Sequence, residues 1–250
     1  MVRIVVFDSG LGSLSIIKPI RKRIDADIIY FADQKNYPYG TKTIPQLDKI
    51  IKSTIMQLQE KFEPDVIIVG SNTPSLLLDI EKKDKIIGVF PPLKEAVQRT
   101  RSGNIGILAT KSVVENKILD RYIRKNVPSK IHVKKINATP LVDLVESGRF
   151  MSQKQTTKGI IKKIIAPHLE NNVDVFTLSS THLPFLVPIL KKLFPGITFL
   201  DPADALAQHI SKISKYKLKK SSLKIYSSGN TESFHKQLLK IGIKNKVNPL

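Results

Sequence analysis

Hydrophobic and polar positions along the chain form two patterns that alternate from start to end. Short runs rich in β-branched residues are typical of buried strands, and longer stretches have the spacing of helices. Predicted strands include Ile4–Phe7 and Asp27–Phe31, and further strands are expected at the start of the stretches Val66–Ser75, Asn104–Ser112 and Val173–His182. Predicted helices include Leu14–Ile24, Ile44–Phe62 and Ser152–Glu170. Strands that alternate with helices predict an α/β fold with parallel sheets and right-handed crossovers.

The pattern begins again in the middle of the chain. After the pair Pro91-Pro92, the stretch Asn104–Ser112 repeats the design of the opening segment, a strand followed by a polar loop. The segment from Ala203 onward is expected to cross back and complete the first half. We therefore predict two similar, doubly wound α/β domains with an active-site cleft between them. The first consists of residues 1–95 and 207–250, and the second of residues 96–206.

Two stretches in different halves end in the same way. Val66–Ser75 and Val173–His182 each continue from a β-branched run into a cluster of small hydroxyl and amide residues. In open parallel sheets, ligands bind at the carboxyl ends of strands. Taken alone, Ser71 and Ser180 are more typical of helix caps. Their matching positions in the two halves favour a single ligand site built from both.

Composition excludes several kinds of chemistry. The 250 residues include no cysteine, which excludes disulfides, thiolate metal sites and thiol nucleophiles. His, Asp and Glu show no convincing metal spacing, so we expect no metal. Gly10-Leu11-Gly12 lacks the third glycine of a dinucleotide fingerprint. We therefore favour a glycine turn that lets a small ligand approach the backbone over a nucleotide-binding site. With neither a signal sequence nor a membrane-spanning run, the expected location is the cytoplasm, without membrane association.

The formal net charge of +20 suggests an anionic partner. Lys and Arg are scattered along the chain, and only residues 212–220 form a dense basic patch. Zinc-finger spacing, aromatic RNA-binding motifs and Gly-x-x-Gly loops do not accompany it. The sequence therefore disfavours specific nucleic-acid binding, while the positive charge suits a small dianionic ligand.

Four motifs, in order and in register, resemble those of the aspartate/glutamate racemase family. They are Phe7–Gly12, Pro38–Lys42, Ser71–Thr73 and Ser180–His182, and the resemblance extends to Tyr226–Asn230. It implies two α/β domains related by a pseudo-twofold axis. It also implies a cofactor-independent racemase that moves the α-proton of a small acidic amino acid, glutamate or aspartate, between two bases. The oligomeric state stays open, with a homodimer as one option.

The resemblance also assigns roles to individual residues. Ser71 and Ser180 occupy the positions of the family's two catalytic cysteines, Asp8 matches the carboxylate that assists the first, and His182 matches the histidine that assists the second. The substrate-binding residues it implies are Ser9, Tyr39, Gly40, Asn72, Thr73, Thr181, Glu146 and Thr110. The match around Thr110 and Ser112 is looser than the others.

Serine in both cysteine positions leaves the chemistry open. An aliphatic hydroxyl is a far weaker acid than a thiol and needs a neighbouring base. In one interpretation Asp8 and His182 act as the bases, directly or through the serines. In another, the protein binds an acidic amino acid or related dicarboxylate without racemising it. Deliberate replacement of both cysteines is disfavoured, because Gly70, Ser179 and Pro74 also depart from the family's usual neighbours.

Overall fold

The computed structural model describes residues 2–80, 85–213 and 221–250, which pack as two compact units. The first contains Met1–Val89 and Ala203–Leu250, and the second contains Phe90–Pro202. The predicted domain boundaries, after residues 95 and 206, lie a few residues beyond the ends of these units. The basic patch predicted at 212–220 lies almost entirely outside the described residues.

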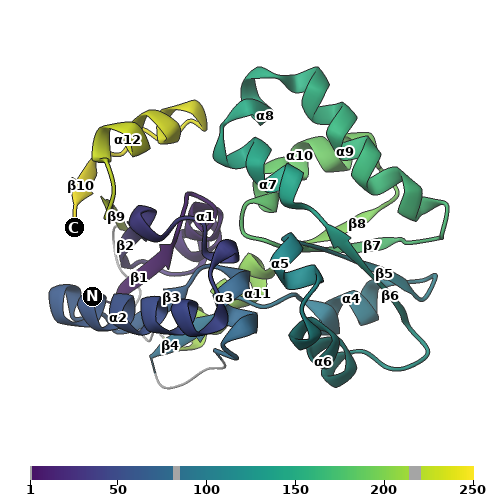
Figure 1. Cartoon of the computed structure of the whole chain (residues 1–250), viewed down its shortest axis with the longest axis horizontal. Coiled ribbons are helices and arrows are strands. Elements are labelled where there is room, and N and C mark those ends of the chain that lie inside the picture. The colour runs from purple at the N-terminus through teal and green to yellow at the C-terminus, as the bar shows by residue number, and fades with distance from the viewer. Residues whose placement is uncertain (1, 81–84, 214–220) are drawn as a thin grey trace. The chain divides into compact units, whose positions relative to one another are not determined.

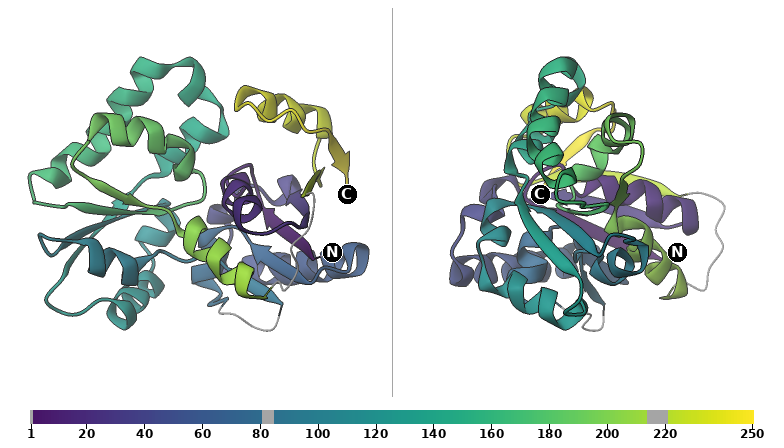
Figure 2. Two further views of the ribbon diagram at one scale, coloured as in Figure 1. Left: turned by 180° about the vertical axis from the view of Figure 1, so that it is seen from behind. Right: turned by 90° about the vertical axis from the view of Figure 1, so that its right-hand side faces the viewer.

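In the described part of the first unit, six parallel strands form one sheet in the order β10-β9-β2-β1-β3-β4. These strands are β1 (Arg3–Asp8), β2 (Asp27–Ala32), β3 (Val66–Val69), β4 (Ile86–Gly88), β9 (Ser222–Ser227) and β10 (Val247–Pro249). The helices are α1 (Leu14–Arg23), α2 (Ile44–Phe62), α3 (Asn72–Leu77), α11 (Pro202–Ile213) and α12 (Thr231–Lys240), with 3-10 turns η1 (Gln34–Asn36) and η2 (Tyr39–Thr41). In Figures 1 and 2 the yellow C-terminal segment belongs to the same unit as the purple strand β1.

Helix α2 covers one face of this sheet. Alternate side chains of the central strands, such as Phe7 and Phe31, form a buried cluster with Leu47, Ile51 and other α2 residues. The helix begins at Ile44 because Thr43 and Gln46 form a capping box, in which each side chain bonds the other's backbone N–H. The predicted helix Ile44–Phe62 is confirmed at both ends.

The described residues of the second unit form a parallel sheet of four strands in the order β6-β5-β7-β8. The strands are β5 (Asn104–Ala109), β6 (His132–Asn137), β7 (Val175–Ser179) and β8 (Thr198–Leu200). The helices are α4 (Leu93–Arg99), α5 (Lys111–Val114), α6 (Lys117–Asn126), α7 (Thr139–Glu146), α8 (Arg149–Ser152), α9 (Lys154–Leu169) and α10 (Val187–Leu193), with the 3-10 turn η3 (Leu183–Leu186). In Figure 1, α7, α9 and α10 lie on one side of this sheet and α4 and α6 on the other.

Several elements differ from the sequence prediction; among them, α6 was not predicted, nor were the bounds of α12. The single helix predicted over Ser152–Glu170 is two helices, α8 and α9, separated by Gln153, whose backbone leaves the helical region at φ −112° and ψ 60°. The short strand β10 was not predicted. It has three residues and contains Pro249, which an edge strand tolerates because one side of its ladder is unpaired.

Asp174 ties the entry of β7 to the turn between α4 and β5. Its carboxylate accepts hydrogen bonds from the Thr100 hydroxyl at 2.6 Å and from the backbone N–H groups of Arg101 and Ser102 at 2.7 and 3.0 Å. Partial burial works to raise the pKa of Asp174, but these hydrogen bonds together outweigh it and hold the pKa below its ordinary value. The charged carboxylate is therefore favoured by folding.

We predict that Asp174→Asn lowers the free energy of unfolding by about 1–2 kcal/mol at neutral pH, because three donors lose a charged acceptor. The native pKa lies below the unfolded value, so this stability is present above roughly pH 4 and is lost as the pH falls through the native pKa. Urea unfolding at neutral and acid pH measures the difference in free energy of unfolding between the variant and the wild type. This difference should become smaller as the pH falls. The exposed Asp143→Asn serves as control, and a difference independent of pH would contradict the assignment.

Candidate active site

The topology of the first unit brings Asp8 and Ser71 to the same edge of its sheet. Strand β1 pairs with β3, with Phe7 beside Val69, and both strands end there. Asp8 is the last residue of β1 and is only 2% exposed. Its carboxylate accepts the backbone N–H of Ser9 at 2.7 Å. A buried carboxylate thus stands at the strand end where the sequence predicted a catalytic group.

Gly70 allows the chain to approach this edge closely. A Cβ atom at this position would lie 2.4 Å from the Cβ of Ser13, on the loop that follows β1. Ser71 comes next and is the N-cap residue of α3, yet its side chain makes no capping hydrogen bond. The Ser71 backbone carbonyl instead accepts the Ser75 hydroxyl at 2.7 Å. Capping therefore does not account for the Ser71 hydroxyl.

Asn72 and Thr73 are buried in the first turn of α3. The Asn72 side-chain amide donates to the Val89 carbonyl at 3.0 Å, which fixes the orientation of the amide group. Its oxygen, Oδ1, has no hydrogen-bond partner among the described residues. Buried polar atoms are seldom left unsatisfied, so Asn72 Oδ1 is a ready acceptor for a ligand.

The loop after β2 is held by Asp33, a residue that the sequence analysis did not single out. Its carboxylate accepts the Tyr39 hydroxyl at 3.0 Å, the Asn36 side-chain amide at 2.8 Å and the Ser228 hydroxyl at 3.1 Å. Burial, with the nearby carboxylates of Asp33 and Asp8, raises the pKa of Tyr39 well above its usual value. Tyr39 is thus a neutral donor bound to Asp33.

Ser9 connects this loop to the end of β1. Its hydroxyl lies 3.5 Å from the Tyr39 backbone N–H, and its carbonyl accepts the Gln34 side-chain amide at 3.2 Å. Gly40 follows Tyr39 in the turn η2. The structure therefore brings Ser9, Tyr39 and Gly40 together beside Asp8, whereas the Tyr39 hydroxyl itself is occupied by Asp33.

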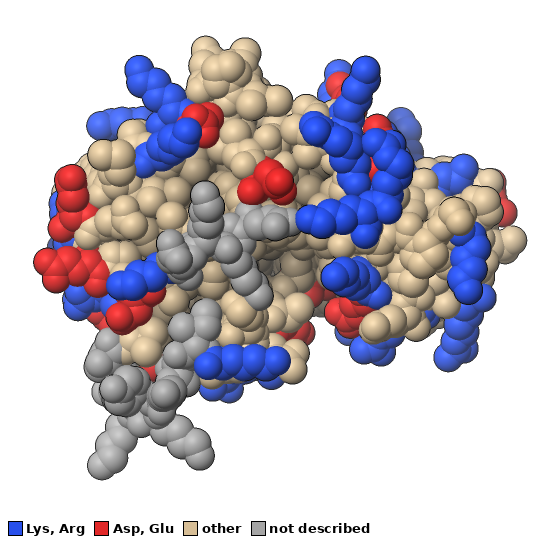
Figure 3. All heavy atoms as spheres, turned by 90° about the horizontal axis from the view of Figure 1, so that it is seen from below, with Lys and Arg blue, Asp and Glu red and all other residues tan. Residues whose placement is uncertain are grey.

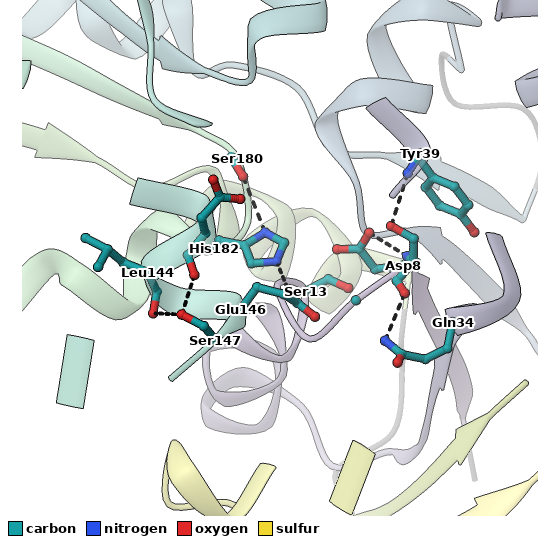
Figure 4. Close-up of polar contacts among 12 residues, drawn as sticks. Asp8, Ser13, Gln34, Tyr39, Leu144, Glu146, Ser147, Ser180 and His182 are labelled. Carbon is teal, nitrogen blue, oxygen red and sulfur yellow. Dashed lines mark hydrogen bonds and ion pairs between the residues drawn. The ribbon is translucent and has the colours of Figure 1, made fainter. Parts of the chain in front are cut away.

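In the second unit, a chain of polar side chains links Ser180, His182 and Glu146. The Ser180 hydroxyl lies 3.5 Å from Nδ1 of His182, and Nε2 of His182 lies 2.6 Å from Oε2 of Glu146. All three residues are less than a tenth exposed. Figure 4 shows the Ser180 hydroxyl directed at the imidazole ring. The fold supplies Ser180 and His182 from the end of β7, and Glu146 from the end of α7.

Thr181 adjoins this group along the chain, and Thr110 follows the neighbouring strand. Strand β5 pairs with β7, with Ala109 beside Ser179, so Thr110 and Ser180 follow neighbouring strand ends. Thr110 is the N-cap residue of α5, and its hydroxyl lies 3.2 Å from that of Ser112. Thr181 is buried directly after Ser180.

The described residues hold neither a cluster of metal-ligating side chains nor a membrane-spanning helix. Within them, no three His, Asp or Glu side chains converge as metal ligands would. None of their helices combines the length and apolar character that a membrane crossing requires. Figure 3 shows Lys and Arg side chains in several separate groups on one face, with acidic side chains among them. The cytoplasmic location and the absence of a metal stay predictions.

Two α/β units with parallel sheets and polar strand ends define a class of two-domain enzymes, and comparison with known proteins specifies the family. Residues 11–210 match the family described as Asp/Glu/Hydantoin racemase. The chain belongs to this family, and its enzyme class is that of the racemases, which are isomerases. The family resemblance predicted from the four motifs is confirmed.

Individual relatives agree with this assignment. A glutamate racemase from Roseiflexus sp. (strain RS-1) is 31% identical over 215 residues, which cover 83% of this chain and 78% of that protein. A glutamate racemase from Bacillus anthracis has a TM-score of 0.85 at 21% identity, covering 100% of this chain and 97% of that one. The Francisella tularensis glutamate racemase in complex with D-glutamate has a TM-score of 0.82 at 23% identity, covering 100% and 97%. These two structures confirm the predicted fold class.

We predict that Gly70→Ala destabilises the protein by about 1–3 kcal/mol, because the added methyl group must displace Ser13. Gly159→Ala, in the interior of α9, is the matched control, since a Cβ there meets nothing within 4 Å. That substitution should stabilise the protein by about 0.5–1 kcal/mol. Urea unfolding of both variants provides the measurement, and a Gly70→Ala variant as stable as the wild type would refute the close approach.

Proposed function

We propose that the protein racemises a small acidic amino acid, glutamate in the first instance, by transfer of the α-proton between two bases without a cofactor. The observation that carries this proposal is the buried chain from Ser180 through His182 to Glu146. The family and the relatives named glutamate racemase support the reaction and the substrate class.

The Glu146 contact determines which nitrogen of His182 can act as a base. An ionised carboxylate only accepts hydrogen bonds, so Nε2 of His182 carries a proton and donates it to Glu146. In the neutral imidazole, Nδ1 then presents its lone pair on the side of Ser180. The carboxylate also stabilises the imidazolium that forms when Nδ1 takes a proton, as in a Ser–His–Asp triad.

Serine does not replace a thiol by itself. A thiol has a pKa of about 8.5, within reach of neutral pH, whereas an alcohol is about as weak an acid as water. We therefore assign the basic function in the second unit to Nδ1 of His182, acting directly on the substrate or through the Ser180 hydroxyl. An imidazole can accept a proton in one direction of the reaction and donate it in the other.

Racemisation needs a second acid–base group on the other face of the α-carbon, and we assign it to the first unit. Asp8 is the candidate, acting directly or through Ser71. Its carboxylate accepts the Ser9 backbone N–H at 2.7 Å, which holds it at the end of β1. Protonation from one face and abstraction from the other then invert the configuration, and the two groups exchange roles in the reverse direction.

Binding groups for a dicarboxylic amino acid come from the strand ends of both units. In this proposal Asn72 Oδ1 accepts from the substrate ammonium group, since it is buried and without a partner among the described residues. Hydroxyl and N–H donors for the carboxylates come from Ser9, Gly40, Thr73, Thr110 and Thr181. The net charge of +20 adds a long-range attraction for a dianion.

One observation favours a second candidate function, binding of the acidic amino acid without racemisation. The Ser71 side chain makes no capping hydrogen bond, and among the described residues its hydroxyl has no contact like that of Ser180 with His182. If Asp8 does not reach the substrate directly, one face of the α-carbon lacks an acid–base group. The pocket would then bind the ligand without inverting it.

Proton NMR of L- and D-glutamate in deuterium oxide, followed together with optical rotation, tests the proposed function. We expect the α-proton to exchange and the rotation to decay toward zero from either enantiomer. His182→Asn and Asp8→Asn should each reduce the rate by about 10²–10⁴-fold, the usual contribution of a general base. Exposed His132→Asn and partly exposed Asp48→Asn provide matched controls and should leave the rate unchanged.

Two results would contradict racemisation. Exchange of the α-proton without loss of optical rotation would mean that only one face carries a base. Binding of glutamate without exchange would favour the second candidate function. A rate that survives both His182→Asn and Asp8→Asn would exclude these residues as the bases.

A further prediction concerns the missing thiols. Introducing them with Ser71→Cys and Ser180→Cys together should raise the racemisation rate by about 10²-fold or more, because a thiolate is accessible near neutral pH. Ser75→Cys in α3 is the control, since the Ser75 hydroxyl is buried and donates hydrogen bonds to backbone carbonyls. If the double variant is no faster than the wild type, the assignment of Ser71 and Ser180 to the thiol positions fails.

A further inference from the structure

A hollow in the first unit is lined by side chains that the proposed function does not use. It is an open depression of about 680 Å³ between α1, the start of β9 and the segment Gly242–Asn245. This volume lies in the range of small-molecule sites. Leu223 is the second residue of β9, so the hollow reaches the amino-terminal edge of the sheet. The candidate catalytic residues of this unit follow the carboxyl ends instead.

One face of α1 forms a wall of this hollow. Leu14, Ile17, Lys18, Arg21 and Lys22 all line it, and their spacing of three and four residues places them on a single stripe of the helix. Leu14 and Ile17 are buried, whereas the three cations are exposed. The wall is therefore apolar toward the start of α1 and cationic toward its end.

The opposite wall continues the same division. Leu223 and Ile243 are partly buried apolar residues, and Lys244 adds a fourth cation from a segment far from α1 in sequence. No carboxylate is among the described residues that line the hollow. The acidic residue Asp204 pairs at 3.7 Å with Arg23, which is not part of the lining.

Helix stability alone does not explain this arrangement. Cations in the last turn of a helix interact favourably with its dipole, which accounts for Arg21 and Lys22. It does not account for Lys244, which lies outside any helix and lines the same hollow. Like charges gathered around an apolar floor repel each other unless an anion lies between them.

We propose that this hollow binds a small amphipathic polyanion of the nucleoside diphosphate class. Arg21, Lys22 and Lys244 contact the phosphates, with the guanidinium offering paired donors to phosphate oxygens. Ile17, Leu223 and Ile243 contact the planar base. Such a site lies outside the racemase chemistry and gives the unit a second ligand.

Titration calorimetry of the full chain with ADP at about 0.15 M salt tests the proposal. Inorganic pyrophosphate and adenosine are titrated separately as the two halves of the probe. We expect ADP to bind more tightly than either, and Arg21→Gln/Lys244→Gln to weaken it about tenfold or more, the loss of a charge-assisted hydrogen bond. Lys49→Gln/Lys61→Gln removes the same net charge from exposed positions of α2 and should leave ADP affinity nearly unchanged.

A separate variant tests the contact between the apolar residues and the base of ADP. Ile243→Ser should weaken ADP and leave pyrophosphate unaffected, which a purely electrostatic attraction does not predict. Equal loss of affinity in the two double variants would overturn the proposal, as would pyrophosphate binding as tightly as ADP or no ADP binding at millimolar concentration. Circular dichroism confirms that each variant is folded before titration.

Discussion

Parallel pairing in a fixed register decides which polar side chains of each unit can meet. Phe7 lies beside Val69 in one sheet and Ala109 beside Ser179 in the other, so the residues that follow these strands leave the sheet at neighbouring points. The central strands are buried on both faces, and a shift of one residue would turn each side chain to the opposite face. The hydrophobic pattern of the strands thus fixes the position of the candidate catalytic groups.

The two strand ends differ in how their serines are supported. Ser180 faces an imidazole that is itself held by a buried carboxylate. An adjacent base of this kind can activate a hydroxyl, which is a weak acid by itself. The Ser71 side chain makes no capping hydrogen bond, and among the described residues the acidic group at the same sheet edge is Asp8. In the account proposed here, the loss of thiols is offset by an imidazole on one face and a carboxylate on the other. This division of labour differs from a symmetric pair of identical bases.

Much of the fold could be predicted from the sequence, because buried strands and α2 have strong local patterns. The proximity of Ser180 and His182 also follows from their spacing, and the family resemblance assigned Glu146 to the same site. The bond between Asp33 and Ser228 could not be found in this way, since these residues are 195 positions apart and only tertiary folding brings them together. The break at Gln153 and the three-residue strand β10 were missed because neither has a strong local signal. The hollow beside α1 was missed for the same reason as the bond of Asp33, since Lys244 joins α1 only in three dimensions.

The central claim is that the His182 imidazole, in one defined tautomer, acts as the general base in place of a thiolate. Nitrogen-15 NMR of the His182 ring, at a pH above its titration, tests this claim directly, with His182→Asn to assign the signals. The account predicts a proton on Nε2, donated to Glu146, and a bare Nδ1 on the side of Ser180. A neutral ring with the proton on Nδ1 and a bare Nε2 would contradict it, because that ring could not accept a proton where the chemistry requires it.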